Sequence, residues 1–546
     1  MALSVIFAMV ASFILSRTFV PTLAMYLLRP HGHGAAEASP PSRNPFVRFQ
    51  KGFEARFQSV RESYSRLLGV FLSRRGAFAA GVLAFALLSL GLTPVLGRNF
   101  FPTVDSGAIA LHVRGPTGLR LEETAALMDR VQQEIRQVIP QEEIDTMVDN
   151  IGLPVSSINS IYNASGTIGS QDGDILISLK HGHGPTGDYV RELRRRLPSA
   201  FPQATFSFLP ADVTSQILNF GSPSPIDIQV TGGSAAENMA HAQRILAAVR
   251  DVDGLVDARI QQPLAAPGLH FEVDRTRMSQ LGLTQADVTN AVAGSIAGSS
   301  QTAPVFWLNP DNGVAYPVVA QAPEYLVDEV QELANLPVTG ANGQSQILGA
   351  LGTFSRTPAP AVVTQYDIQP TVNIYAAVQD RDLGAVAADV DRILERLDAG
   401  KPERVRVVLR GQYETMDIAF SGMGLGLLGA VVLIYLLVVV NFQSWTDPLV
   451  IISALPSALA GIVWMLFATG TTLSVPALTG AILCMGVATA NSILVVSFAR
   501  ERLAVVGDPV QAAFEAGVAR FRPVIMTALA MIIGMAPMAL AIGAGA

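Results

Sequence analysis

Charged residues are scarce in this sequence, and cysteine is almost absent. Only 15% of the 546 residues are charged and 50% are hydrophobic, whereas about 25% of residues in ordinary soluble proteins are charged. This composition excludes a disordered chain and a collagen-like fibre. The formal net charge of −7 argues against a nucleic-acid-binding protein, which needs a basic face. The lone Cys484 excludes an intrachain disulfide, and no Cys or His spacing of a structural metal site surrounds it.

Several stretches without charge are long enough to cross a membrane. No Asp, Glu, Lys or Arg occurs in the 52 residues between Asp447 and Arg500, which hold two spans of about 20 residues and a hairpin. The predicted spans are 2–28, 77–96, 419–440, two within 448–499, and 523–542. The alternatives are a secretory signal peptide for the first stretch and buried helices of a soluble protein for the others.

The distribution of basic residues predicts the orientation of these spans. The connection 29–75 carries nine Lys or Arg and three Glu, which places it in the cytoplasm by the positive-inside rule. Four arginines between the last two spans lie on the same side when the helices are counted. The long segment 98–420 carries 23 basic and 37 acidic residues. The same count predicts a large acidic domain outside the cytoplasm.

That domain has a repeated strand-helix-strand pattern. Residues 109–113 alternate between the two faces of a strand, and the turn GPTG then leads into a helix with one apolar face, made of Met128, Val131, Ile135 and Val138. The pattern recurs at 175–197 with a second GPTG, and similar units start at 226 and 372. Such units favour ferredoxin-like α+β subdomains. Two similar turns that arose by chance are the alternative for the GPTG match.

Ordered motifs along nearly the whole chain resemble the second half of a resistance-nodulation-division (RND) efflux permease. They are NFFP (99–102) with Asp105 and Gly107, FEVDRTRMSQLGLTQADV (271–288), GQYETM (411–416), NFQSWTDPLVIISALP (441–456), MGVATANSILVV (485–496) and RFRPVIMTALAMIIGMAPMAL (520–540). The branch that the sequence resembles is the hydrophobe/amphiphile, or acriflavin-resistance, group.

The resemblance implies an α-helical membrane bundle plus α+β periplasmic porter subdomains built from ferredoxin-like βαβ repeats. We expect the sixth to the eleventh of the family's twelve helices, and therefore a fragment. The expected parts are a membrane helix (1–28), a cytoplasmic basic connection (29–75), a membrane helix (76–97), a periplasmic porter and docking domain (98–418) and four membrane helices (419–546).

The function implied by the resemblance is proton antiport that exports small amphiphilic or toxic compounds, as in multidrug resistance. It further implies a homotrimer in the bacterial inner membrane, joined to a periplasmic adaptor protein and an outer-membrane channel. No cofactor or metal site is expected. The sequence shows no catalytic triad, P-loop or dinucleotide fingerprint, so we expect no enzyme. The alternatives are a heavy-metal or lipid exporter of the same fold and a non-transporting scaffold or protein-export helper.

The resemblance also places a proton relay in the membrane helices, at Asn491, Arg520 and Thr527. The family has a lysine directly before the asparagine, where this chain has Ala490, so either another cation pairs with the family's carboxylates or this branch couples differently. Each relay residue has an alternative, purely structural interpretation. In that interpretation Arg520 is a positive-inside anchor, Thr527 bonds back to its own helix, and Asn491 joins two helices by a hydrogen bond.

The residues that mark a substrate are few. Drug-exporting members have a phenylalanine-rich loop where this chain reads SINSIYNASGTIGSQDGD (157–174), in which Tyr162 is the single aromatic residue. This loop does not support a broad drug pocket. Two HGHG runs (31–34 and 181–184) suggest a metal site, but histidines flanked by glycine are usually solvated, and the predicted topology puts the runs on opposite sides of the membrane.

Overall fold

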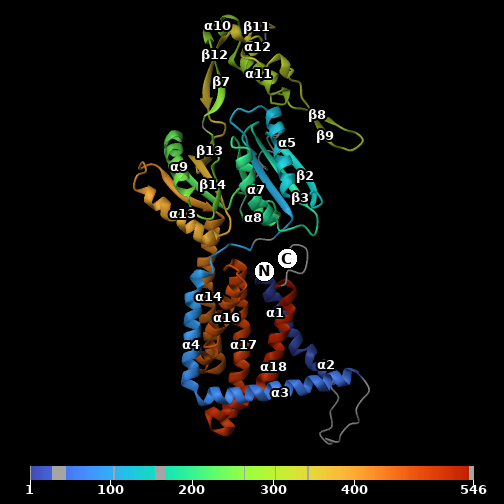
Figure 1. Ribbon diagram of the computed structural model, residues 1–546, viewed down its shortest axis with the longest axis vertical. Coiled ribbons are helices and arrows are strands. Elements are labelled where there is room, and N and C mark those ends of the chain that lie inside the picture. The colour runs from blue at the N-terminus through green and yellow to red at the C-terminus, as the bar shows by residue number, and fades with distance from the viewer. Residues whose placement is uncertain are drawn as a thin grey trace. The chain divides into compact units, whose positions relative to one another are not determined.

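The structure is a computed structural model that describes residues 2–27, 45–102, 105–153, 167–219, 221–263, 265–301, 303–340 and 343–539 (Figure 1). The chain forms two compact units. One consists of Met1–Arg75 and Phe498–Pro523, and the other of Gly76–Ser497 and Val524–Ala546. The first of the two HGHG runs lies outside the described residues, as does the part of the loop 157–174 that contains Tyr162.

The first unit is helical. Its helices are α1 (Ala2–Arg17), α2 (Phe19–Leu27) and α3 (Pro45–Ser73), together with the end of α17 (Val475–Val506) and the beginning of α18 (Pro509–Ala539). Helix α3 packs on α18, where the rings of Tyr64 and Phe521 stack with centroids 4.3 Å apart. Arg522 forms an ion pair of 3.3 Å with Glu54. The predicted basic connection is therefore helical over much of its length.

Within the described residues, six helical segments are long and apolar enough to cross a membrane. They are Ile6–Leu27, Arg75–Val95, Gln412–Phe442, Thr446–Ala468, Val475–Val506 and Pro509–Pro537. The second unit contributes α4 (Arg75–Leu92), η1 (Thr93–Val95), α14 (Gln412–Phe442), α15 (Thr446–Ile452), α16 (Leu455–Ala468) and parts of α17 and α18. At most 17% of any of these spans is buried in the protein, as expected where apolar side chains face lipid. The six segments overlap the six spans predicted from the charge-free stretches.

Along the sequence of the second unit, a first antiparallel sheet follows α4 and precedes α14. Its elements are β1 (Ala108–Arg114), α5 (Leu121–Val138), β2 (Ile144–Ile151), β3 (Asp172–Leu179), α7 (Thr186–Ala200) and β4 (Thr205–Leu209). The strand order is β2-β3-β1-β4, and a short helix, α8 (Val213–Leu218), follows.

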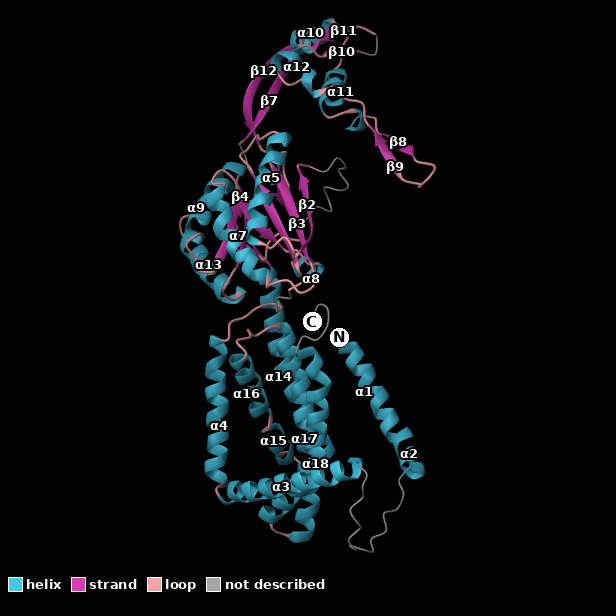
Figure 2. Cartoon of the chain, turned by 45° about the vertical axis from the view of Figure 1, so that its right-hand side comes forward, coloured by secondary structure: helices cyan, strands magenta, loops and turns pink. Residues whose placement is uncertain are grey.

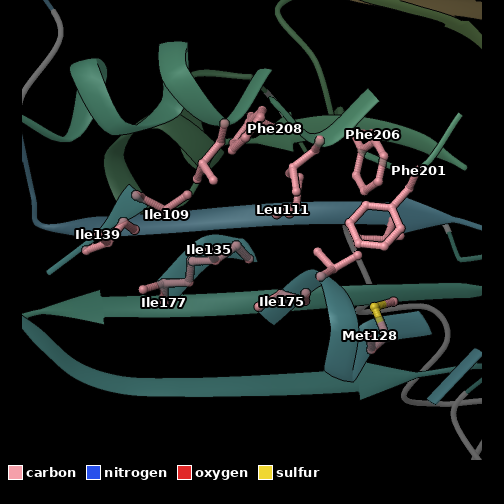
Figure 3. Packing of buried hydrophobic residues seen from close by; sticks show 14 of the residues in the cluster. Ile109, Leu111, Met128, Ile135, Ile139, Ile175, Ile177, Phe201, Phe206 and Phe208 are labelled. Atoms are coloured by element: carbon pink, nitrogen blue, oxygen red, sulfur yellow. The ribbon is translucent and has the colours of Figure 1, made fainter. Parts of the chain in front are cut away.

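The apolar face of the first sheet packs against α5 and α7. Leu111 and Ile175 on the strands lie against Met128 and Ile135 on α5 (Figure 3). These four residues and Leu193 on α7 are fully buried. The period-two alternation of the strands meets the helical stripe of α5, as the sequence pattern predicts. The opposite face of β1 then carries His112 and Arg114.

A second sheet repeats this connectivity. Its elements are β5 (Ile226–Thr231), α9 (Ala235–Val249), β6 (Leu255–Ile260), β14 (Gln369–Val378), α13 (Leu383–Asp398) and β15 (Arg406–Gly411). Strand β14 pairs with β5 and β6, β5 pairs with β15, and β13 (Thr364–Tyr366) extends the edge of β14. A capping box at Ser234 and Glu237 begins α9, and the Asp382 side chain caps α13.

The segment between β6 and β13 extends away from the second sheet. Strands β7 (Ala266–Val273) and β12 (Gly352–Ala359) form an antiparallel ribbon (Figure 2). Beyond the ribbon are α10 (Arg275–Gln280), α11 (Gln285–Ile296), η2 (Ser299–Gln301), β8 (Val305–Leu308), β9 (Ala315–Val318), η3 (Glu324–Leu326), α12 (Val330–Ala334), β10 (Pro337–Thr339), β11 (Ser345–Ile347) and η4 (Leu348–Ala350). Helices α10, α11, α12 and η4 and strand β10 share a small core around Val338, Leu348 and Leu351.

The architecture thus combines apolar helices of membrane-spanning length with α+β subdomains, which confirms that part of the prediction. Each of the four strand-helix-strand units expected from the sequence corresponds to one half of a sheet: two units form the first sheet and two form the second.

Candidate functional site

Two of the three predicted relay residues are in contact. Asn491 lies on α17 and Thr527 on α18, and the Thr527 hydroxyl donates a hydrogen bond of 3.1 Å to Asn491 Oδ1. The same hydroxyl lies 2.9 Å from the carbonyl oxygen of Val524, one turn back on its own helix. The geometry therefore contains the structural alternatives considered for both residues, the back-bond of Thr527 and the hydrogen bond by which Asn491 joins two helices.

The third relay residue, Arg520, and the position of the family's lysine, Ala490, differ in character. Ala490 is exposed and carries only a methyl group, so it supplies no cation. Arg520 belongs to the first unit, where its guanidinium lies 4.7 Å from the centroid of the Phe498 ring. A cation over an aromatic face is stabilised by the ring quadrupole. The relay role of Asn491, Arg520 and Thr527 stays a prediction.

The polar face of the first sheet carries a buried histidine-carboxylate pair. His112 on β1 and Asp174 on β3 are direct cross-strand partners, and His112 Nδ1 lies 2.8 Å from Asp174 Oδ1. His112 is 1% exposed and Asp174 6%. Because an ionised carboxylate only accepts, Nδ1 carries a proton, and in the neutral form of the ring Nε2 keeps its lone pair. Nε2 has no hydrogen-bond partner in the described part of the chain.

The next cross-strand pair on this face is ionic. Arg114 Nε lies 2.8 Å from Asp172 Oδ1, and the carboxylate is fully buried. Asp172 Oδ2 also accepts from the backbone N–H of Ile168 at 2.7 Å. Arg114 Nη1 donates to the carbonyl oxygen of Gln261, which follows β6 of the second sheet. The pair therefore links the two sheets and neutralises its own buried charge.

Asp227 and Arg259, which are buried on the second sheet, form no such ion pair in the described part of the chain, although Arg410 is the cross-strand neighbour of Asp227. Asp227 on β5 accepts hydrogen bonds from the amides of Asn373 at 2.9 Å and Gln229 at 2.8 Å. Burial raises the pKa of its carboxyl, and the two amide hydrogen bonds oppose this shift. Arg259 on β6 is 5% exposed, and burial lowers its pKa to about 10. Burial also raises the pKa of Tyr375, its cross-strand neighbour.

A second ion pair connects the sheets on the side of α7. Arg194 Nη2 lies 2.7 Å from Asp257 Oδ2, which also accepts from the backbone N–H of Phe208 at 3.0 Å. The Arg194 guanidinium lies 4.9 Å from the centroid of the Phe208 ring. A groove of about 470 Å³ begins here and is lined by Arg194, Thr205, Arg250 and Asp257 among others. Its walls belong to both sheets.

The second HGHG run does not form a metal site in the described structure. His181 is exposed, and His183 Nδ1 lies 2.7 Å from the carbonyl oxygen of Gly184. Across the described ranges, no group of three or more His, Cys, Asp or Glu side chains is placed to hold a metal ion.

Sequence analysis missed the polar face of the first sheet. A signal was present, because His112 and Arg114 alternate with Leu111 and Val113 on β1. Asp172 and Asp174 likewise occupy alternate positions at the start of β3. The pairing of β1 with β3 brings these residues together, but the paired residues lie about 60 positions apart along the chain. Pairing at that distance has no local signature in the sequence.

Comparisons with known proteins give one family. The model of the AcrB/AcrD/AcrF family matches residues 1–546. The cation efflux system protein CzcA of Alcaligenes sp. (strain CT14) is 25% identical over 567 residues, which cover 100% of this chain and 49% of that protein. The multidrug resistance protein MdtC of Yersinia pestis bv. Antiqua is 25% identical over 542 residues, 98% of this chain and 49% of that protein.

The fold is also found among solved structures. The X-ray crystal structure of a heavy metal efflux pump, crystal form II, gives a TM-score of 0.71 at 23% identity, and the match covers 89% of this chain and 48% of that one. The chain spans about half the length of the curated relatives that it matches.

Proposed function

The chain belongs to the AcrB/AcrD/AcrF family of RND permeases, and we propose that it forms part of a proton-driven efflux transporter whose cargo is a metal cation. The family and the six helices of spanning length make it a multi-pass protein of the bacterial inner membrane. The proposal has three parts: that the protein exports a compound, that this compound is a metal cation, and that export is driven by protons.

One observation carries the choice of cargo. Asp174 holds His112 in the tautomer that leaves the Nε2 lone pair available, and no described residue uses that lone pair. Histidines that bind metals typically donate their other ring N–H to a carboxylate in this way, which fixes the ring and raises its basicity. Imidazole nitrogen suits zinc, copper, nickel and related ions. His112 is then a ligand, and Asp174 orients it.

The comparisons support the same cargo. A relative that matches the whole chain is named a cation efflux protein, and the solved structure with the same fold is titled a heavy metal efflux pump. An acidic domain outside the cytoplasm, with the net charge of −14 that 23 basic and 37 acidic residues give, attracts cations over long range.

Export of amphiphilic compounds is the second candidate. It is favoured by the absence of any group of three or more metal-ligating side chains in the described ranges and by the relative that is named a multidrug resistance protein. The first sheet supplies one histidine and its orienting carboxylate, so a complete metal site needs further ligands.

The finer architecture belongs to the same proposal. The two sheets, each with βαββαβ connectivity and antiparallel strands, are inferred to be ferredoxin-like porter subdomains on the periplasmic side, and the α3 side is inferred to be cytoplasmic. A homotrimer, a periplasmic adaptor protein and an outer-membrane channel complete the pump. Proton transfer passes the Asn491, Thr527 and Arg520 region, and no enzymatic step or cofactor takes part.

The test is a tolerance assay with the complete gene that encodes the chain. It is expressed in a host that lacks its own exporters, and growth is measured against zinc, cobalt, nickel, cadmium and copper salts and against cationic dyes and detergents. We expect tolerance to at least one metal, and its loss in His112→Ala at equal protein amount in the membrane. His270→Ala, at an exposed histidine of β7, is the matched control and should keep it.

Two results would contradict the metal cargo. Tolerance only to dyes or detergents would establish the second candidate, and a His112→Ala variant with unchanged metal tolerance would remove the residue on which the choice rests. No tolerance to any compound would contradict efflux itself.

A further inference from the structure

Three segments that are distant in sequence meet where helix α4 ends. Residues 97–100 follow α4, residues 382–384 begin α13 on the second sheet, and residues 472–475 lead into α17. Asn99 N–H donates to Leu473 O at 3.0 Å, and Leu473 N–H donates to Gly97 O at 3.1 Å. Gly384 N–H donates to Arg98 O at 2.9 Å. Main-chain bonds therefore tie residues 97–100 to both neighbours.

The side chain of Asn99 joins the same two neighbours to each other. Its Oδ1 accepts from the backbone N–H of Leu383 at 2.8 Å, and its Nδ2 donates to Thr472 Oγ1 at 3.1 Å. The two atoms belong to one planar amide, so they keep a fixed geometry. One rigid group thus connects the first turn of α13 with Thr472 in the segment that leads into α17.

The backbones approach closely at this junction. Gly97 has φ +67°, and a Cβ at this position would lie 2.7 Å from Cγ of Asp382. Asp382 caps α13 through the N–H of Ala385 and also accepts from the N–H of Arg98, both through Oδ2. A residue with a side chain at 97 is therefore strained in φ and collides with the cap.

Apolar packing continues through the junction. Phe100 is 7% exposed and lies in the core of the second sheet, together with Met416 from the first turns of α14 and the partly buried Val475 at the start of α17. Close-packed interiors transmit displacement because they deform little. Hydrogen bonds and core packing therefore join the same membrane helices to the second sheet.

We propose that Asn99 is a positioning residue that couples α17 to α13. When the surroundings of Asn491 on α17 change with proton uptake, the start of α17 shifts, and the Thr472–Asn99–Leu383 connection carries the shift into the second sheet. Asn99 contacts neither cargo nor proton carrier in this scheme. The inference rests on the proposed function, because it assumes that the membrane helices drive the sheets.

A purely structural anchor would hold α13 in place without transmitting anything. The two roles differ in a cycle of substitutions. We measure hydrogen exchange of the amides 383–387 in the purified full-length protein, with and without Asn491→Ala on α17. In the otherwise unchanged protein, Asn491→Ala should alter the exchange rate by about fivefold, the lower end of usual coupling between sites.

The coupling should disappear when the connection is cut at its Thr472 end. Thr472→Val removes the hydroxyl that accepts from Asn99 and leaves the size of the side chain nearly unchanged, so Asn491→Ala should no longer affect residues 383–387. Thr472→Ser should restore the effect. Thr471→Val, at the exposed neighbouring position, is the matched control and should preserve it. Asn99→Ala is informative as well if it folds, but the threonine variants decide the question without it.

An equal response to Asn491→Ala in the Thr472→Val and Thr472→Ser proteins would overturn the proposal, and so would no response in the unchanged protein. The exchange assay needs no cargo, so it decides the role of Asn99 even if the protein exports none of the tested compounds and the proposed function fails. Where export is found, Thr472→Val should lower its maximal rate about tenfold while the half-saturating cargo concentration is kept, since it removes an interaction used in turnover and not in binding.

Discussion

In the first sheet Arg114 and Asp172 form a buried ion pair, whereas Asp227 and Arg259 on the second sheet form no ion pair in the described part of the chain. Arg114 and Asp172 lie 2.8 Å apart, with the carboxylate fully buried. In the second sheet, Nε and Nη2 of Arg259 are buried without a partner in the described part of the chain, and Asp227 accepts hydrogen bonds from amides. The two sheets have the same connectivity, so the difference does not arise from topology.

The comparison separates stability from function. A paired buried charge is destabilising chiefly when one partner is removed. A lone buried charge destabilises the folded state as it stands, because desolvation is not offset by a partner. The first sheet is therefore expected to be sensitive to substitution of its charges, and the second sheet is expected to tolerate or gain from it.

The largest expected effect is on the first sheet. Asp172→Asn leaves the Arg114 guanidinium without its counter-ion, and we expect a loss of about 3 kcal/mol in the opening free energy of β3. Hydrogen exchange of the β3 amides in the detergent-solubilised full chain measures it. Asp145→Asn, at an exposed aspartate of β2, is the control. Equal losses in the two variants would show that the buried pair adds nothing.

The sequence predicts which apolar residues form the cores, but it does not predict which polar residues pair with one another. Local periodicity placed Leu111 in an alternating strand and Met128 and Ile135 on one apolar helix face, and all three are fully buried. The same holds for Ile226 and Ile228 on the second sheet. Such patterns are local because each element has to bury its own apolar face.

The partners of the polar residues were not predictable in this way. Arg114 and Asp172 are 58 positions apart, and Asn99 and Leu383 are 284 apart. The β7–β12 ribbon likewise joins segments about 80 positions apart. These contacts depend on strand register and on chain crossing between subdomains, and a single sequence carries no periodic signal for either.

The second-largest effect should be a gain in stability, at Arg259 of the second sheet. Arg259→Met replaces a buried cation by an apolar side chain of similar length, and we expect the opening free energy of β6 to rise by about 1 kcal/mol. Burial lowers the pKa of Arg259 to about 10, so the folded state holds this proton less tightly than the unfolded state. The gain should therefore be full below pH 10 and shrink at higher pH. Arg356→Met on the exposed face of β12 should give no gain, and a loss in Arg259→Met would mean that the guanidinium is stabilising.

A smaller, pH-dependent effect is expected at Asp227. Burial raises the pKa of its carboxyl in the folded state, so the folded state binds this proton more tightly than the unfolded state does. Stability from this group is complete below the unfolded pKa of about 4 and is lost as the pH rises through the folded pKa. Asp227→Asn should remove that slope and change the opening free energy of β5 at neutral pH by less than about 1 kcal/mol. Parallel pH profiles of the two proteins would contradict this assignment.

The smallest effect is expected on the helices that cover the sheets, where both sheets carry exposed ion pairs. Arg195 pairs with Glu192 on α7, and Arg392 pairs with Asp389 on α13; the two arginines are 75% and 70% exposed. Water and salt screen such pairs, and holding two long side chains in one geometry costs entropy. Arg195→Ala and Arg392→Ala should therefore leave hydrogen exchange in β3 and β14 unchanged within error. If either variant changed the exchange rates as much as Asp172→Asn does, the electrostatic difference between the two sheets would lie on the helix surfaces. Unchanged exchange rates confine that difference to the buried polar faces of the sheets.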